Sequence, residues 1–154
     1  MLLTLCALIE EVLSMIRTYD ELITIPTFEK RYEYLKLRSG VGVATFGSDR
    51  YLNQVLYTSP EWKSFRNRII LRDNGCDLAM EDRAIFGNIT IHHLNPITVD
   101  DVVNRNPMVF DPNNVVCVSR NTHNAIHYGD EKLLVPSKPN IRAPHDTCPW
   151  KEGN

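Results

Sequence analysis

The sequence lacks the marks of several protein classes. Its four cysteines, at positions 6, 76, 117 and 148, form no Cys-x-x-Cys pair, so neither a four-cysteine zinc site nor a disulfide scaffold is indicated. The 7 glycines and 9 prolines follow no repeat, which argues against a fibrous protein. This use of cysteine is typical of a reduced, cytoplasmic-type protein.

Long apolar runs are also missing. Met1 to Ile9 is apolar except for Thr4, but no Lys or Arg precedes it and two glutamates follow it. A signal peptide needs a positive N-terminal region, and a membrane span needs about 20 apolar residues. We therefore expect an amphipathic helix of about 15 residues that packs on the body or on a second copy; contact with a membrane surface is the alternative. Met15 is a second candidate start, which would make residues 1–14 an upstream extension.

An excess of positive charge is missing too. The 154 residues carry 17 basic and 19 acidic side chains, a net charge of −2. A nucleic-acid binder needs Lys and Arg to neutralise phosphates, so such a chain must concentrate its basic residues. Segment 59–72 does so, with four basic residues and one acidic residue. Lys63, Arg66 and Arg72 are candidate contacts to a DNA backbone; ordinary solvated charges beside a core stripe are the alternative.

The hydrophobic content of 43% and the charged content of 23% are typical of one globular domain. Three stretches before residue 74 predict helices. The first covers 28–37, with Thr24 or Thr27 as its cap and Pro26 in its first turn, and the second covers 49–57. The third begins with Ser59 as N-cap and Pro60 at its first position. Four prolines in 135–154 predict an extended tail.

The most informative region follows residue 74, because four of the five histidines lie between 92 and 127. Residues 84–86 and 89–92 are the predicted arms of a hairpin, joined by Gly87-Asn88. Residues 115–118 are prone to form a strand. A helix capped by Asn121 or Thr122 is expected to run to Tyr128 and to end at Gly129.

The histidine spacing predicts a metal site. His123 and His127 lie at i and i+4, on one face of the expected helix, where two imidazoles can share an ion. His92 and His93 are neighbours on a strand and point to opposite faces, so His92 can join the site while His93 stands beside it. With an ordinary pKa of about 6.5, an unligated histidine suits general-base work. Either pair alone fits purely structural histidines equally well; the combination favours the metal site.

The segment 74–129 resembles the HNH nuclease motif, the ββα-metal fold. His92-His93-Leu94-Asn95-Pro96 is similar to the first-strand signature of that family, Asn114-Val115-Val116 to its middle asparagine and strand, and residues 122–127 to its closing helix. The steps of nine residues from Asn114 to His123, and of four to His127, match as well. The lead-in 62–76 resembles phage-encoded members.

The chain also departs from the family pattern. Cys76 has no partner three residues on, and Thr122 stands where a cysteine often precedes the closing histidine. We therefore expect no structural zinc, and interpret Cys76 and Cys117 as small buried apolar residues. His92 replaces the usual first-position aspartate; the family includes variants with three histidine ligands.

The predicted elements and the resemblance together indicate an α+β fold, with a helical region at 1–58, an HNH nuclease domain with its lead-in helix at 59–134 and an extended tail at 135–154. The resemblance implies a metal-dependent DNA endonuclease that hydrolyses phosphodiester bonds. His92, His123 and His127 would hold one divalent ion (Mg²⁺, Mn²⁺, Ni²⁺, Co²⁺ or Zn²⁺) that stabilises the scissile phosphate and the leaving oxygen. His93 would take a proton from the attacking water, and Asn114 would keep His93 oriented.

The expected partner is double-stranded DNA, with no membrane. Two biological roles fit a phage-type protein in the host cytoplasm: a homing-type endonuclease, or a nicking partner of a packaging protein such as terminase. The rival from a different class is a non-catalytic, metal-stabilised module that binds DNA or protein. Such a module has no use for His93 as an unligated fourth histidine.

Overall fold

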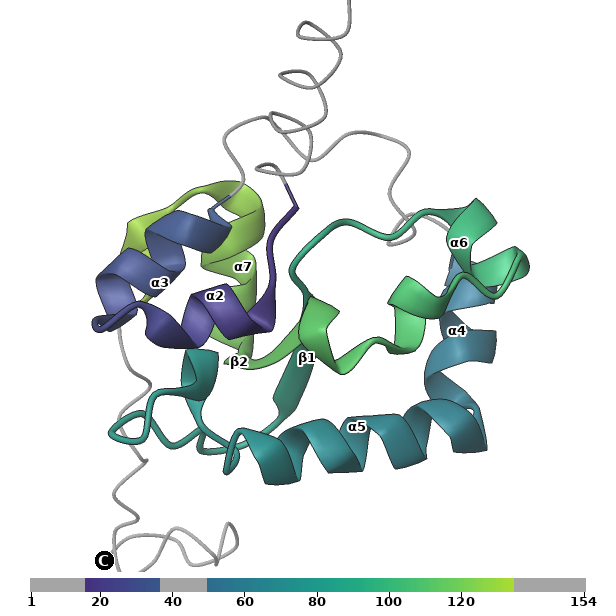
Figure 1. Ribbon diagram of the computed structural model, residues 1–154, viewed down its shortest axis with the longest axis horizontal. Helices are drawn as coiled ribbons and strands as arrows, with labels where there is room; N and C mark the ends of the chain where they lie inside the picture. Colours follow the sequence, from purple (N-terminus) through teal and green to yellow (C-terminus); the bar gives the residue numbers. More distant parts are fainter. Residues whose placement is uncertain (1–15, 37–49, 135–154) are drawn as a thin grey trace, which may run out of the picture.

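The computed structural model describes residues 16–36 and 50–134 (Figure 1). It is a mixture of helices and one two-stranded antiparallel sheet, so the expected α+β class is confirmed. The predicted N-terminal helix and the predicted extended tail lie outside the described residues. Among the residues that the structure describes, no helix is long and apolar enough to cross a membrane.

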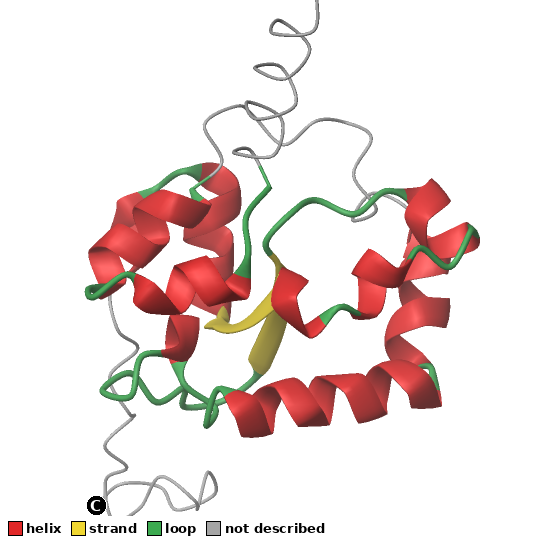
Figure 2. Cartoon of the chain, viewed as in Figure 1, coloured by secondary structure: helices red, strands yellow, loops and turns green. Residues whose placement is uncertain are grey.

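Helices make up most of the described chain and lie around the two strands (Figure 2). The α-helices and strands are α2 (Tyr19–Thr24), α3 (Phe28–Leu35), α4 (Arg50–Thr58), α5 (Pro60–Arg72), β1 (Ile89–His93), α6 (Val99–Val103), β2 (Val115–Ser119) and α7 (Arg120–Tyr128). Short 3-10 turns lie between and after them: η2 (Asp77–Ala79), η3 (Pro107–Phe110), η4 (Pro112–Asn114) and η5 (Glu131–Leu134).

The helix starts follow the capping residues. Ser59 accepts a hydrogen bond from the backbone N of Trp62, with Pro60 in the first turn of α5 as predicted. Thr27 caps α3, so Pro26 precedes the helix instead of lying in its first turn. The prediction missed α2, a six-residue helix that is too short to show a periodic pattern.

The predicted hairpin is wrong in its first arm. Strand β1 pairs with β2 in antiparallel fashion, with Ile89 opposite Ser119 and His93 opposite Val115. Residue Ala84 instead forms an isolated bridge with Cys76, and Ile85 N donates to Gly75 O at 3.0 Å. Residues 84 and 85 therefore pair with Cys76 and Gly75 in the preceding loop. The strand that pairs with β1 comes instead from residues 115–119.

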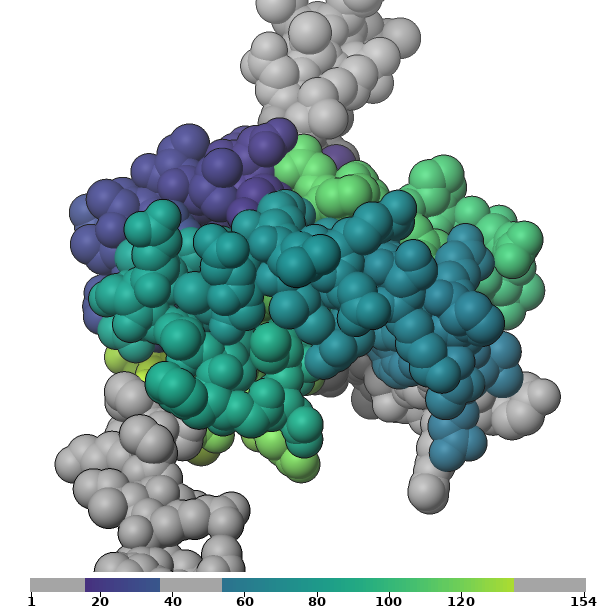
Figure 3. Space-filling view, turned by 90° about the horizontal axis from the view of Figure 1, so that it is seen from below, coloured from purple at the N-terminus to yellow at the C-terminus, as the bar shows by residue number. Residues whose placement is uncertain are grey.

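Two apolar clusters cover the two faces of the sheet. Side chains of β2 alternate between them, as the period of a strand requires. Val116 and Val118 pack with α3 and α7, whereas Val115 and Cys117 pack with α5. Seen from the side of α5, residues of α4, α5 and the following loop form a continuous surface over this part of the molecule (Figure 3). The sheet is thus enclosed between helices, and Cys117 is a buried free thiol as expected.

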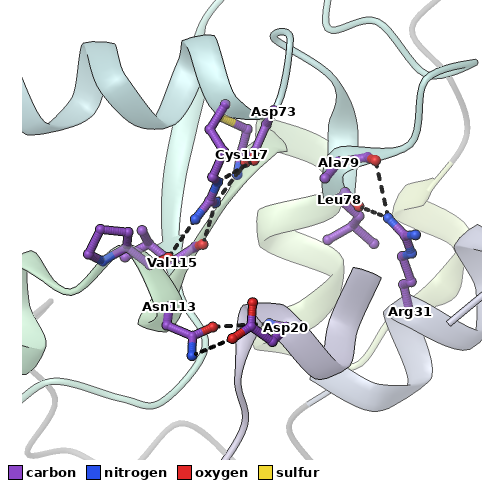
Figure 4. A network of polar contacts seen from close by, with 10 residues as sticks. Asp20, Arg31, Asp73, Leu78, Ala79, Asn113, Val115 and Cys117 are labelled. Carbon is purple, nitrogen blue, oxygen red and sulfur yellow. Dashed lines mark hydrogen bonds and ion pairs between the residues drawn. The ribbon is translucent and has the colours of Figure 1, made fainter. Parts of the chain in front are cut away.

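Polar side chains join α2 and α3 to the 3-10 turns beside the sheet, and join the end of α5 to β2 (Figure 4). Arg31 of α3 donates from Nη1 to Leu78 O at 2.7 Å, and Asp20 of α2 accepts from Asn113 Nδ2 at 3.1 Å. Asp73, at the end of α5, accepts from the backbone N of Cys117 at 2.8 Å. These bonds fix α2, α3 and α5 around β2, which carries the chain into α7.

Candidate metal centre

Three imidazoles meet between β1 and α7. His92 comes from β1, and His123 and His127 come from successive turns of α7. One nitrogen of each ring lies within 4.8 Å of the corresponding nitrogens of the other two. The ring centroids of His123 and His127 are 4.4 Å apart, and that of His92 lies 5.5 and 5.2 Å from them. We call these residues the histidine triad; the structure brings together all three predicted ligands.

The start of α7 is fixed by a buried carboxylate that the sequence did not point to. Ser119, rather than Asn121 or Thr122, is the N-cap, and its Oγ accepts from the backbone N of Thr122 at 3.1 Å. Asp77 accepts from Thr122 Oγ1 at 2.5 Å and from Ser119 N at 3.2 Å. Gly129 ends the helix with φ 66°, as predicted. Asp77 therefore sets the position of the helix that carries His123 and His127.

Burial keeps the triad neutral. It lowers the pKa of His92 well below its usual value, and the neighbouring histidines lower it further. Burial lowers the pKa of His123 to about 4 and also lowers the pKa of His127. Metal ligation requires unprotonated imidazoles. At neutral pH the three rings are therefore in the state that binds an ion.

The donor set fits a divalent transition metal. Nitrogen ligands about 2.0–2.1 Å from a tetrahedral ion lie about 3.4 Å from one another. The triad nitrogens lie within 4.8 Å of one another, which is close enough for all three to face one ion. Among the described residues no carboxylate belongs to the cluster. Three neutral nitrogen donors suit Mn²⁺, Co²⁺, Ni²⁺ or Zn²⁺ better than Mg²⁺.

His93 points to the other face of the sheet. Its ring stacks on Trp62 of α5, with centroids 5.8 Å apart, and its Nε2 lies 3.0 Å from Val109 O. A carbonyl oxygen can only accept, so Nε2 carries the proton and Nδ1 keeps its lone pair. Burial also lowers the pKa of His93. The predicted division between the neighbouring histidines is present: His92 joins the triad, and His93 stands beside it as a neutral, oriented imidazole.

Asn114 joins the two segments around His93. Its Oδ1 accepts from Asn95 Nδ2 at 2.7 Å and from Asn95 N at 3.1 Å. Its Nδ2 donates to Met108 O at 3.0 Å, one residue before the carbonyl of Val109 that binds His93. This arrangement suits the positioning duty expected of Asn114. The side chain of Asn95, not singled out from the sequence, is its direct partner.

The structure does not bring the predicted DNA-contacting residues together with the triad. Arg66 donates from Nη2 to Ile89 O at 2.9 Å, and Arg72 donates to Val115 O at 2.8 Å while pairing with Asp73. Helix α5, which carries them, packs on the sheet face opposite to α7. Arg66 and Arg72 thus have internal structural contacts, and Lys63 is exposed. A DNA contact by Lys63 stays a prediction.

In comparisons with known proteins, no family model, no curated protein and no solved structure matched the chain. The arguments for its function therefore come from the geometry of the site and from the sequence motif.

Proposed function

We propose that the chain is a metal-dependent DNA endonuclease of the HNH type, which hydrolyses phosphodiester bonds. One observation carries the proposal. Adjacent residues of β1 place His92 in a triad of imidazoles and His93 outside it, with Nε2 held by Val109 O. A structural metal site accounts for the triad but gives no reason for an oriented fourth histidine. A metal-dependent hydrolase uses a metal site together with a base that takes a proton from water.

The triad would hold one divalent ion through His92, His123 and His127. When bound, such an ion supplies positive charge for a phosphate oxygen and for the leaving oxygen. The chain contributes ligands that are already unprotonated at neutral pH, because burial lowers their pKa values. The nitrogen donors favour Mn²⁺, Co²⁺, Ni²⁺ or Zn²⁺, with Mg²⁺ able to support turnover.

His93 is the proposed general base. Its Nδ1 would take a proton from water, whose oxygen forms a bond to phosphorus while the in-line bond from phosphorus to O3′ breaks. The released O3′ would take its proton from solvent. The Nε2–H···O=C bond to Val109 fixes the tautomer and stabilises the ring once it is charged. Asn114 holds the loop that presents this carbonyl. The expected products carry a 5′-phosphate and a 3′-hydroxyl group.

One observation favours the rival, a non-catalytic metal-stabilised module. Arg66 and Arg72 bond inside the chain, so segment 59–72 offers DNA fewer free guanidinium donors than its composition indicated. Nicking of supercoiled plasmid with Mn²⁺, with EDTA as control, separates the two functions. We expect nicking by the unsubstituted protein and its loss in EDTA. Metal binding that raises the melting temperature without any nicking would favour the module.

The two biological roles predict different cleavage patterns in the nicking assay. A homing-type endonuclease cuts a long DNA at one or a few positions, which sequencing of the ends would show. A nicking partner of a packaging terminase is expected to nick more broadly and to respond to added terminase. The resemblance to phage-type members supports both roles equally.

A further inference from the structure

A short N-terminal segment, Ile16–Thr18, is tied to the residues around the histidines. The backbone N of Arg17 donates to Asn95 Oδ1 at 2.9 Å, and Arg17 O accepts from Asn95 Nδ2 at 2.8 Å. The same Asn95 side chain donates to Asn114 Oδ1. Although 78 residues separate Arg17 from Asn95, both belong to the hydrogen-bonded network that holds the loop of Val109.

The guanidinium of Arg17 is held at Nε, whereas the described residues leave its two terminal nitrogens available. Its Nε donates to Tyr34 O at 2.6 Å, in the last turn of α3, where carbonyls lack helical partners. Within the described part of the chain, no hydrogen bond uses the terminal nitrogens of this guanidinium. Arg66 and Arg72, by contrast, donate from their terminal nitrogens to backbone carbonyls. Arg17 therefore keeps a fixed, half-buried fork of donors.

Arg17 lies near the histidine triad. The Asn95 side chain, which bonds to both backbone groups of Arg17, belongs to the residue three positions after His92. A divalent ion bound by the triad would repel the nearby guanidinium, since both are cations in a partly buried site. An oxyanion between them offsets this repulsion. A phosphate with two free oxygens matches the planar donor fork of arginine.

We propose that Arg17 binds a backbone phosphate of DNA beside the histidine triad. The inference rests on the proposed function, since it takes the substrate of that site to be a nucleic acid. It assigns a phosphate contact to the N-terminal segment, whereas Arg66 and Arg72 of α5 are held by the sheet. In the alternative outcome Arg17 only completes the last turn of α3; replacing it would then lower stability without removing a DNA contact.

Binding of a short fluorescent duplex across a series of salt concentrations tests the proposal. The full chain carries His93→Ala and Mn²⁺, so that the duplex stays intact. Adding Arg17→Gln is expected to weaken binding about 10–100-fold, as for a charge-assisted hydrogen bond. The slope of log K against log salt should lose about 1 unit in magnitude, the value for one phosphate contact. Arg17→Lys should keep the slope, because it keeps the charge.

Arg105→Gln is the matched control. Its side chain is 86% exposed and lies 3.8 Å from Glu61, so its loss should leave affinity and slope unchanged. If Arg17→Gln does not fold, phenylglyoxal labelling of the unsubstituted protein replaces it, and bound duplex should protect Arg17 but not Arg105. An unchanged salt slope in a folded Arg17→Gln protein, no protection of Arg17, or no duplex binding by the parent overturns the proposal.

The nicking assay tests the proposed function separately from the role of Arg17. Plasmid nicking by the unsubstituted protein together with an unchanged slope in Arg17→Gln overturns only the role of Arg17. No nicking together with an Arg17-dependent slope overturns only the nuclease. Melting temperatures recorded for every variant show whether a loss of affinity comes from a loss of fold.

Discussion

The two faces of the β1–β2 sheet come from alternate residues of the same strands, yet they are completed in different ways. On the α5 face His93 has a protein partner, since Val109 O binds its Nε2 and Trp62 covers its ring. On the α7 face His92 meets two other neutral imidazoles. Three neutral imidazoles whose ring nitrogens come together contribute little to the stability of the fold unless a cation lies between them. On the α5 face protein contacts therefore hold His93 at its ring face and at Nε2, whereas we expect the α7 face to depend on a metal.

The largest effect is expected from a change to the α7 face. His123→Ala removes one ligand of the triad, so both metal binding and nicking should fall to the level of protein treated with EDTA. His127→Ala should cause a partial loss, because His127 lies at the end of α7, where water can replace its ring more easily than that of the more buried His123. Calorimetric titration with Mn²⁺ and the plasmid assay, run on the same preparations, measure both quantities. Full nicking by a metal-free His123→Ala protein would contradict the triad.

A change to His93 tests the other face. His93→Ala should lower the nicking rate about 10²–10⁴-fold, the usual contribution of a general base, and leave metal affinity unchanged. If the two faces have different roles, the nicking rate must fall in this variant while metal affinity stays the same. If His93→Ala lost the metal but cleaved normally with excess ion, the base assignment would be wrong and His92 would become the candidate.

The histidine arrangement could be predicted because it depends on local periodicity. The alternation of a strand separates His92 from His93, and the i, i+4 spacing of a helix joins His123 to His127. The caps of α3 and α5 were predictable for the same reason, since capping involves residues a few positions apart.

The parts that escaped prediction depend on contacts distant in the sequence. The β-prone residues 84–86 look like a partner for β1, but residue 85 bonds to Gly75 and β1 pairs with β2. Composition could not show that Arg66 and Arg72 would bond to strand carbonyls, nor that Asp77 would hold the start of α7. Each of these pairings is decided by the tertiary fold.

A smaller effect is expected at Asn114, which connects the segment after β1 to the loop of Val109. Asn114→Ala should lower the nicking rate about 10–100-fold, the usual range for a residue that orients another, with no change in metal stoichiometry. Asn113→Ala is the control, because the adjacent amide bonds instead to Asp20. Equal rates for the two variants would contradict a positioning role for Asn114.

The pH dependence of stability should test the burial of His123 on the α7 face without any DNA. The pKa of His123 is about 4 in the folded chain, below the value of about 6.5 expected for an unfolded one. Between these values the unfolded chain binds more protons, so the metal-free protein should lose stability as the pH falls from about 6.5 towards 4. Urea titrations across this range measure the loss, and His123→Gln should reduce it. A slope unaffected by His123→Gln would show that other groups dominate.

The smallest effect is expected from removing residues 1–14. A variant that begins at Met15 keeps Arg17, whose backbone pairs with Asn95, and keeps all of α2. We expect it to be soluble, to melt close to the full chain and to nick plasmid at a similar rate. A variant whose native residues begin at Asp20 also loses the bonds between Arg17 and Asn95, and should nick more slowly. Loss of soluble protein on truncation to Met15 would show that the first 14 residues contribute to the core. Equal nicking by both truncated proteins would instead show that the site functions without the segment before α2.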